Sequence, residues 1–280
     1  MRKLKIKKNY IPLVLMAVSC VIMAVLCGIK AVDDIKYNEK LVSSDIIPRT
    51  DAVIIADGGN GTEIPKNTKF AVDDLMTKNF SAIKIDARLT KDKKWVSIES
   101  ENISVVTDGK GNVKNINYYD LLNYNIKNFN PQEFPVIELV ENTAKYAYEN
   151  NVFPVIFFHD YNKSAIKNLL GKLSDNGTHI LYFASDDIKV LEYIRTLNSD
   201  ASLLYYVSEI SDEALEKCKS DSNMTLCFNA EKEKKISVKI EKMTSENIAF
   251  MCHGAETLSD IEKLYKLGVR HFITDTVAVE

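Results

Sequence analysis

The sequence is poor in the residues that mark fibrous or linker-rich proteins, since its 280 residues include only 10 Gly and 6 Pro. It has no glycine-rich phosphate loop, no G-x-S-x-G nucleophile elbow and no H-E-x-x-H zinc motif. Only Cys218, Cys227 and Cys252 lie beyond residue 30, and an odd number of cysteines cannot all pair within one chain. Their spacing resembles no zinc motif and their surroundings are apolar, so we expect three buried thiols.

The chain also lacks a long basic stripe. Its net charge is −3, but five basic residues among the first eight leave −8 on the rest. Contacts with nucleic-acid phosphates need clustered Lys and Arg, so the acidic body argues against nucleic acid as the main partner. With 46% hydrophobic and 27% charged residues, the composition is that of a globular protein.

One long uncharged segment is present, from residue 10 to residue 29. A helix of this length spans about 30 Å, the thickness of the hydrocarbon core of a bilayer. The segment predicts a transmembrane helix over residues 10–29, and the basic residues 1–9 favour a cytoplasmic N-terminus. We therefore expect a single-pass protein of the cell membrane, with a tether over residues 30–50 and an extracytoplasmic domain over residues 51–280.

The same segment is compatible with two other interpretations. A cleaved signal peptide has an equally basic start, but the apolar run is long for one and no clear small-x-small cleavage site follows it. Lipoprotein processing is disfavoured because the apolar run continues past Cys20, and Leu26 is a poor residue before a lipidated Cys27.

The body of the chain alternates short apolar or β-branched runs with amphipathic stretches, which is typical of an α/β fold with a parallel sheet. Ser211 is placed to begin a helix, and Gly268 to end the helix that starts near Thr257. The nine predicted strands are Ala52–Ala56, Ala82–Ala87, Trp95–Ile98, Val152–Phe158, His179–Phe183, Ser202–Val207, Met224–Phe228, Ile248–Cys252 and His271–Thr274.

The link between the second and third predicted strands decides the architecture. Residues 89–94 are too few for a parallel crossover, which needs a dozen or more residues. The strand at Trp95 must therefore return antiparallel, as a β-hairpin excursion after strand 2. Eight parallel strands remain, which predicts a (β/α)8 TIM-type barrel. A doubly wound open sheet is the alternative, but no G-x-G-x-x-G follows the first strand.

Several stretches of the domain resemble, in order and spacing, the motifs of the glycerophosphodiester phosphodiesterases. The family's motifs are, in order, A-H-R-G with P-E-N-T, E-x-D, V-V-x-H-D, the segment that directly follows V-V-x-H-D, I-P-T-L-E-E and the terminal L-G-V-D-G-I-I-T-D. The matching stretches here are Ile54–Ala71, Ile83–Leu89, Trp95–Glu101, Thr107–Val113, Phe134–Val140 and Leu267–Asp275. The resemblance implies a barrel that hydrolyses glycerophosphodiesters with a divalent cation, such as calcium or magnesium, held by carboxylates at the C-terminal mouth, and with two histidines that transfer protons.

Carried over residue by residue, the resemblance keeps few of these groups. The two histidines fall on Asp57 and Glu99, and two acidic positions fall on Lys66 and Lys84, so that Asp86 alone remains as a ligand. The family's I-E-I-K strand aligns with Ile156–His159, which places Phe157 at the position of its metal-binding Glu. Its W-T-V-N motif falls on His253–Glu256, so its Trp and Asn are also absent.

These changes reverse the charge where a cation would bind. Lysines 66 and 84 would repel a divalent ion, and the carboxylates of Asp57 and Glu99 would be near enough to pair with them. We therefore have no confident catalytic residue among the family-equivalent positions Asp57, Lys66, Lys84, Asp86 and Glu99. A new cation site made by the three carboxylates at positions 57, 86 and 99 is a weaker interpretation, because the lysines oppose it.

The sequence thus predicts a catalytically inactive, membrane-anchored barrel, a pseudoenzyme of this family. We expect it to bind a phosphate-bearing or other anionic small molecule, or a protein partner, through Lys66, Lys84, His159 and His253. The alternative is an active phosphoric diester hydrolase of glycerophosphodiester lipid metabolism with an altered site, in which His159, His253 and the carboxylates do the chemistry.

Overall fold

The computed structural model describes residues 52–59, 64–78, 80–127, 135–175, 182–232 and 235–275. The predicted basic N-terminus, transmembrane helix and tether, and the start of the predicted strand at His179, lie outside these residues. Among the described residues, no helix is both long and apolar enough to cross a membrane. The barrel belongs to a compact unit that runs from Asp51 to Glu280.

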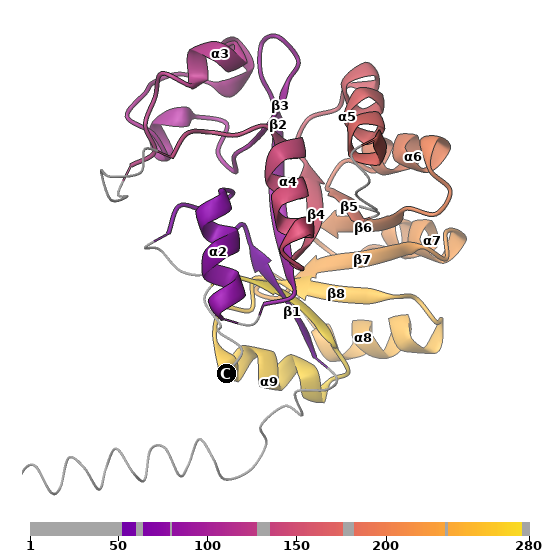
Figure 1. Cartoon of the computed structure of the whole chain (residues 1–280). Coiled ribbons are helices and arrows are strands. Elements are labelled where there is room, and N and C mark those ends of the chain that lie inside the picture. Colours follow the sequence, from indigo (N-terminus) through magenta and orange to yellow (C-terminus); the bar gives the residue numbers. More distant parts are fainter. Residues whose placement is uncertain are drawn as a thin grey trace, which may run out of the picture. The chain divides into compact units, whose positions relative to one another are not determined.

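Eight parallel strands close into a barrel, as the sequence predicts (Figure 1). Each strand pairs with the next around the ring, and the last pairs with the first through Val53 opposite His271 and Ile55 opposite Ile273. The strands are β1 (Val53–Asp57), β2 (Ala82–Leu89), β4 (Phe153–Phe158), β5 (Tyr182–Ser185), β6 (Ser202–Val207), β7 (Met224–Asn229), β8 (Phe250–His253) and β9 (His271–Thr274).

The predicted hairpin is confirmed. β3 (Trp95–Ser97) pairs antiparallel with the end of β2, with Leu89 opposite Trp95 and Ala87 opposite Ser97. The chain then forms an excursion with the short helices η2 (Ile103–Val105), η3 (Val113–Asn115) and α3 (Tyr118–Leu121). This excursion has a small core of its own, made by Val96, Ile98, Ile103, Val113, Leu121 and Ile137.

The longer helices surround the barrel (Figure 1). Ser211 accepts a hydrogen bond from the backbone N–H of Ala214 and begins α7, while Gly268, at φ +107°, follows the end of α9; both predicted helix boundaries are confirmed. The helices are α2 (Lys69–Thr77), α4 (Val140–Glu149), α5 (Lys163–Asp175), α6 (Ile188–Leu197), α7 (Asp212–Ser220), α8 (Ile236–Ser245) and α9 (Leu258–Lys266).

The barrel interior is filled by side chains from alternate strand positions, because successive residues of a strand point to opposite faces. They form one buried cluster that includes Ile55, Val155, Phe157, Tyr206 and Ile273. The thiols of the three cysteines at positions 218, 227 and 252 are free and buried, as predicted.

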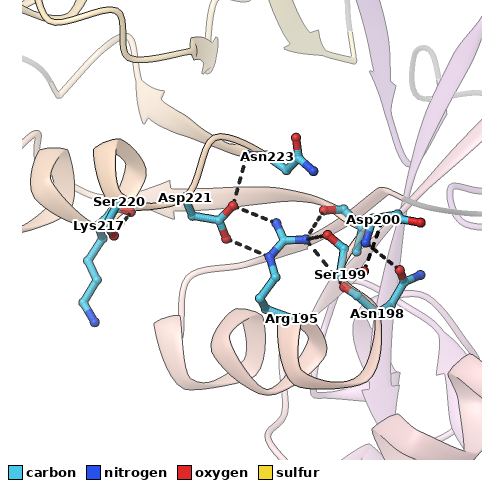
Figure 2. A network of polar contacts seen from close by, with 9 residues as sticks. Arg195, Asn198, Ser199, Asp200, Lys217, Ser220, Asp221 and Asn223 are labelled. Atoms are coloured by element: carbon cyan, nitrogen blue, oxygen red, sulfur yellow. Dashed lines mark hydrogen bonds and ion pairs between the residues drawn. The ribbon is translucent and has the colours of Figure 1, made fainter.

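Arg195 ties together two loops at the end of the barrel where strands begin (Figure 2). Its guanidinium makes two hydrogen bonds, of 2.8 and 3.0 Å, to the carboxylate of Asp221 at the end of α7. It also donates to the carbonyls of Ser199 and Ala201, both at 2.7 Å, in the loop before β6. This network fixes the entry of β6 and β7 and lies at the end opposite the barrel mouth.

Candidate functional site at the barrel mouth

Strand alternation decides which polar residues face the barrel axis. Ala82 is in the interior cluster, so Lys84 and Asp86 on the same strand point inward as well. Ile55 places Asp57 inward by the same rule, and Val155 and Phe157 place His159 on the inner side just beyond β4. The sequence resemblance thus leads to residues that do meet at the C-terminal mouth.

Lys84 is the centre of this site. Its Nζ lies 2.6 Å from Asp57 Oδ1 and 3.1 Å from Asp86 Oδ1, and the residue is only 7% exposed. Burial opposes the charge of Lys84, but the carboxylates of Asp86 and Asp57 outweigh it and hold the pKa of Lys84 above its usual value. The ammonium is therefore charged throughout the physiological range and is neutralised from two sides.

Asp86 is fully buried and its carboxylate is held by three groups. Lys84 approaches Oδ1, His159 Nε2 lies 2.8 Å from the same oxygen, and the Asn67 amide donates to Oδ2 at 3.1 Å. Burial raises the pKa of Asp86, but Lys84, His159 and Asn67 together hold it well below its usual value. Asp86 thus remains an ionised carboxylate inside the barrel.

Asn67 is a site residue that the sequence analysis did not select. It is 2% exposed, its side-chain oxygen accepts from the backbone N–H of Asp86 at 2.8 Å, and its backbone N–H donates to the Gly58 carbonyl at 2.7 Å. Asn tolerates the left-handed conformation that this position adopts, at φ +61°. Its retention in the P-x-N-T stretch was the signal that could have identified it.

Lys66 and Glu99 do not join the Lys84 cluster. The sequence led us to expect that Lys66 pairs with Asp57 or Glu99, but its Nζ lies 2.6 Å from Asp275 Oδ2, just after β9. The expectation failed because Asp275 is 209 residues away in sequence and is brought to the mouth only by barrel closure. The side chain of Glu99 is exposed, and its backbone carbonyl accepts from Arg88 Nε at 2.6 Å.

Aromatic rings cover the other side of the cluster. The Phe157 ring lies beneath Lys84 Nζ, 5.1 Å from its centre, and within 4.7 Å of the rings of His159 and Tyr206. The next ring is that of His253, 5.0 Å from Tyr206. Burial lowers the pKa of His253 to about 4, so this imidazole is neutral at physiological pH.

Tyr206 is also buried at the mouth. Its hydroxyl makes no well-formed hydrogen bond with the described residues, and burial, the Cys227 thiol and the carboxylates of Asp57 and Asp86 raise its pKa. The aromatic side of the mouth therefore offers the neutral rings of Phe157 and His253 and a protonated phenol rather than anionic ligands.

The residues present do not fit a divalent cation. Asp57 Oδ1 and Asp86 Oδ1 are both in contact with Lys84 Nζ, so the ammonium already binds one oxygen of each carboxylate that would have to hold the ion. Phe157 adds a ring where the aligned motif has a carboxylate. Hard divalent cations need several oxygen ligands and are repelled by an ammonium at this distance.

A sequence model of the glycerophosphoryl diester phosphodiesterase family matches residues 59–279. The chain belongs to the glycerophosphoryl diester phosphodiesterase family. This confirms the resemblance seen in the motifs, because the match covers nearly the whole barrel domain. No curated protein sequence matches the chain significantly.

Solved structures of family members share the fold of this member. A phosphodiesterase from Oleispira antarctica, in complex with the product sn-glycerol-3-phosphate, has a TM-score of 0.69 at 16% identity and covers 80% of this chain and 93% of its own. A putative glycerophosphoryl diester phosphodiesterase from Agrobacterium tumefaciens has a TM-score of 0.70 at 15% identity, covering 81% and 94%. One from Parabacteroides distasonis has a TM-score of 0.65 at 17% identity, covering 83% and 85%.

Proposed function

We propose that this family member is a non-hydrolytic barrel that is held at the outer face of the cell membrane by residues 10–29 and binds a phosphate-bearing ligand at its mouth. The observation that carries the proposal is the position of Lys84, whose ammonium lies between Asp57 and Asp86.

Loss of hydrolysis follows from the electrostatics of this position. A unit charge pair at 4 Å is worth about 4 kcal/mol at an effective dielectric of 20, so the Lys84 ammonium alone repels a divalent ion at that distance by roughly 8 kcal/mol and cancels the attraction of one of the two carboxylates. Lys84 stays charged because its two carboxylates raise its pKa. Without the ion, the phosphate loses the group that would neutralise its charge in the transition state.

Ligand binding is best supported at Lys66. Its ion pair with Asp275 is partly open to solvent, with 29% and 32% of the two side chains exposed. Such a pair stabilises the fold by only about 1 kcal/mol or less, so a phosphate can replace Asp275 as the partner of the ammonium. Lys84 is less available, because it is buried and its charge is neutralised by Asp57 and Asp86. His159 and His253 supply neighbouring ring nitrogens at the same mouth.

A hydrolysis assay tests the loss of catalysis. The detergent-solubilised full chain is incubated with glycerophosphodiesters and calcium, magnesium or manganese, and the released alcohol is measured. We expect no cation-dependent turnover above that of the Asp86→Ala variant. Turnover clearly above this control would refute the non-hydrolytic assignment.

The Lys84→Glu variant tests the charge reversal directly, because it restores the family's E-x-D pattern. Three carboxylates would then face one another at positions 57, 84 and 86. We expect calcium to raise the melting temperature of this variant and to leave the wild-type protein and a Lys84→Gln control unchanged. A calcium-induced shift in the wild-type protein would contradict our assignment.

The binding half of the proposal is tested by calorimetry with sn-glycerol 3-phosphate, with glycerol as the uncharged control. We expect the phosphate ester, and not glycerol, to bind with a component whose affinity falls about tenfold in Lys66→Gln. Absence of heat at millimolar ligand, or no component that weakens in Lys66→Gln, would remove Lys66 as the phosphate ligand.

A second candidate function rests on the contact between His159 Nε2 and Asp86 Oδ1. A histidine oriented by a buried carboxylate is an arrangement that can take and return a proton, so an altered, cation-independent diester hydrolase is the alternative. Turnover in the presence of a chelator that is lost in His159→Gln, at unchanged melting temperature, would favour it. Absence of turnover in both proteins would exclude it.

Membrane attachment is tested separately. N-terminal sequencing of the membrane-bound protein should begin at or near Met1, and the barrel should be accessible to protease from outside the cell. A mature N-terminus near residue 30 would show that residues 10–29 are a cleaved signal.

A further inference from the structure

A cavity lies on the outer flank of the barrel, and none of its lining residues belongs to the mouth site. Its volume is about 300 Å³, and it lies between the turn that joins β2 to β3, the start of α4 and the face of α5 that runs from Ser164 to Lys172. Figure 1 shows the β2–β3 hairpin above α4, with α5 to its right. Phe157 points into the barrel, so Phe158, which contacts Trp95 of the cavity wall at 5.0 Å, points outward. The cavity and the mouth are thus on opposite sides of β4.

The charge of this cavity is positive. Lys93 and Lys94 are exposed on the hairpin turn and form no ion pair within the described part of the chain. Lys172 on α5 pairs with Glu141 at the start of α4, a carboxylate that is 7% exposed. One lining acid therefore pairs with one of the three lining lysines, Lys94 interacts with the nearby Asp92 without a salt bridge, and the cavity lining keeps an excess of positive charge.

Asp92, the acid in the same turn, is already committed to the local backbone. Its Oδ1 accepts from the hydroxyl of Thr90 at 2.7 Å and from the backbone N–H of Tyr118 at 2.9 Å. These hydrogen bonds hold Asp92 as part of the turn and, together with the charge of Lys94, lower its pKa against a small opposing effect of burial. It does not line the cavity.

The remaining wall combines an apolar floor with polar groups. Trp95 is 3% exposed, and its indole N–H is one of two buried side-chain polar groups in the described residues that have no hydrogen-bond partner. Leu169 continues the apolar surface, and Ser164 and Asn168 on α5 add a hydroxyl and an amide. An apolar floor with a few polar groups and a charged rim is typical of a small-molecule site.

We propose that this flank cavity binds a small organic phosphate, such as a phosphorylated polyol. Lys93 and Lys94 bind the phosphate at the rim, the Lys172–Glu141 pair orients the hydroxyl groups, and Trp95 with Leu169 contacts the carbon skeleton. The volume is at the lower end of the range for ligand sites and accommodates a molecule of this size. The inference is independent of the function proposed for the mouth, because it uses none of the same residues.

The single tryptophan of the chain makes a direct test feasible, since Trp95 is the only residue of its type and lines the cavity. Tryptophan emission of the full chain is titrated with sn-glycerol 3-phosphate and with inorganic phosphate. Glycerol and sodium chloride of matched ionic strength are the controls. The variants are Lys93→Gln/Lys94→Gln at the cavity and Lys66→Gln at the mouth.

We expect a saturable change with sn-glycerol 3-phosphate, a dissociation constant at least about tenfold higher in Lys93→Gln/Lys94→Gln, and no change of affinity in Lys66→Gln. A weaker saturable response to inorganic phosphate would support contact with the carbon skeleton. The inference is overturned if no phosphate compound gives a saturable response, if sodium chloride gives the same response, or if Lys66→Gln abolishes it while the double variant does not. Failure of the mouth proposal alone would leave this result unchanged.

Discussion

Replacing Lys84 with methionine tests the central interaction of the barrel mouth. Methionine keeps much of the apolar stem and removes the ammonium, so that Asp86 is left fully buried without its main counter-charge. Breaking a buried ion pair by removing one partner costs about 3–5 kcal/mol. For a domain of this size each kcal/mol lowers the melting temperature by about 2–4 °C, so we expect a decrease of roughly 6–20 °C.

The matched control is Lys66→Met, which removes the other mouth lysine. Its pair with Asp275 is partly solvent-exposed, so the expected loss is about 1 kcal/mol or less and the melting temperature should fall by no more than about 4 °C. Thermal unfolding followed by circular dichroism measures both variants at neutral pH. Equal decreases in melting temperature in Lys84→Met and Lys66→Met would refute the argument that burial makes the Lys84 ion pairs contribute more to stability than the Lys66 ion pair.

The pH dependence supplies a second readout with a definite sign. The pKa of Asp86 is depressed in the folded wild-type protein, so its contribution to stability is present above the unfolded value of 3.8 and is lost as the pH falls below it. Without Lys84, burial dominates and the pKa of Asp86 should rise above 3.8. Acidification from pH 7 to pH 5 should therefore reduce the difference in free energy of unfolding between Lys84→Met and the wild-type protein. A constant difference would show that a raised pKa of Asp86 is not the cause of the lost stability.

Three further predictions concern other parts of the barrel. The pKa of buried His253 is about 4, against 6.5 in the unfolded chain, so the free energy of unfolding of the wild-type protein should fall by about 2 kcal/mol from pH 7 to pH 5. In urea unfolding, His253→Gln should not show this decrease. Arg195→Ala should lower stability by about 1–3 kcal/mol in urea unfolding, because it removes the hydrogen bonds to Asp221 and to two backbone carbonyls, while Arg195→Lys, which keeps the charge, should lose less; equal losses would show that the charge contributes nothing without the bidentate geometry. Gly109→Ala would place Cβ 2.6 Å from the Tyr124 ring and should speed proteolysis of the excursion; wild-type cleavage rates would show that the ring moves aside.

Local sequence patterns predicted the barrel because each element could be identified by itself. The strands Ser202–Val207 and His271–Thr274 have the predicted bounds, and the short link before Trp95 led to the hairpin. Errors occur at strand ends, where β8 begins at Phe250 rather than at the predicted Ile248. The apolar run begins before the first residue that pairs with a neighbouring strand, so the hydrophobic pattern does not define the first residue of the strand.

The candidate site was predicted in part. The motif positions led to Lys84, Asp57 and Asp86, and the structure brings these three together. Asn67 was overlooked because an amide carries no charge signal in a sequence, although it binds Asp86 through both its side-chain polar atoms.

The sequence by itself determined the order of strands and helices, the hairpin and the positions where lysines replace acidic residues, because these depend on local spacing and residue type. Only the tertiary structure decided which charges neutralise one another. Lys66 and Asp275 are neighbours solely because β9 closes the barrel against β1, and the cavity beside Trp95 exists solely because α4 and α5 pack against the hairpin turn. Ion pairs and cavities depend on distances in space, which the closure of the chain sets and which no single segment contains.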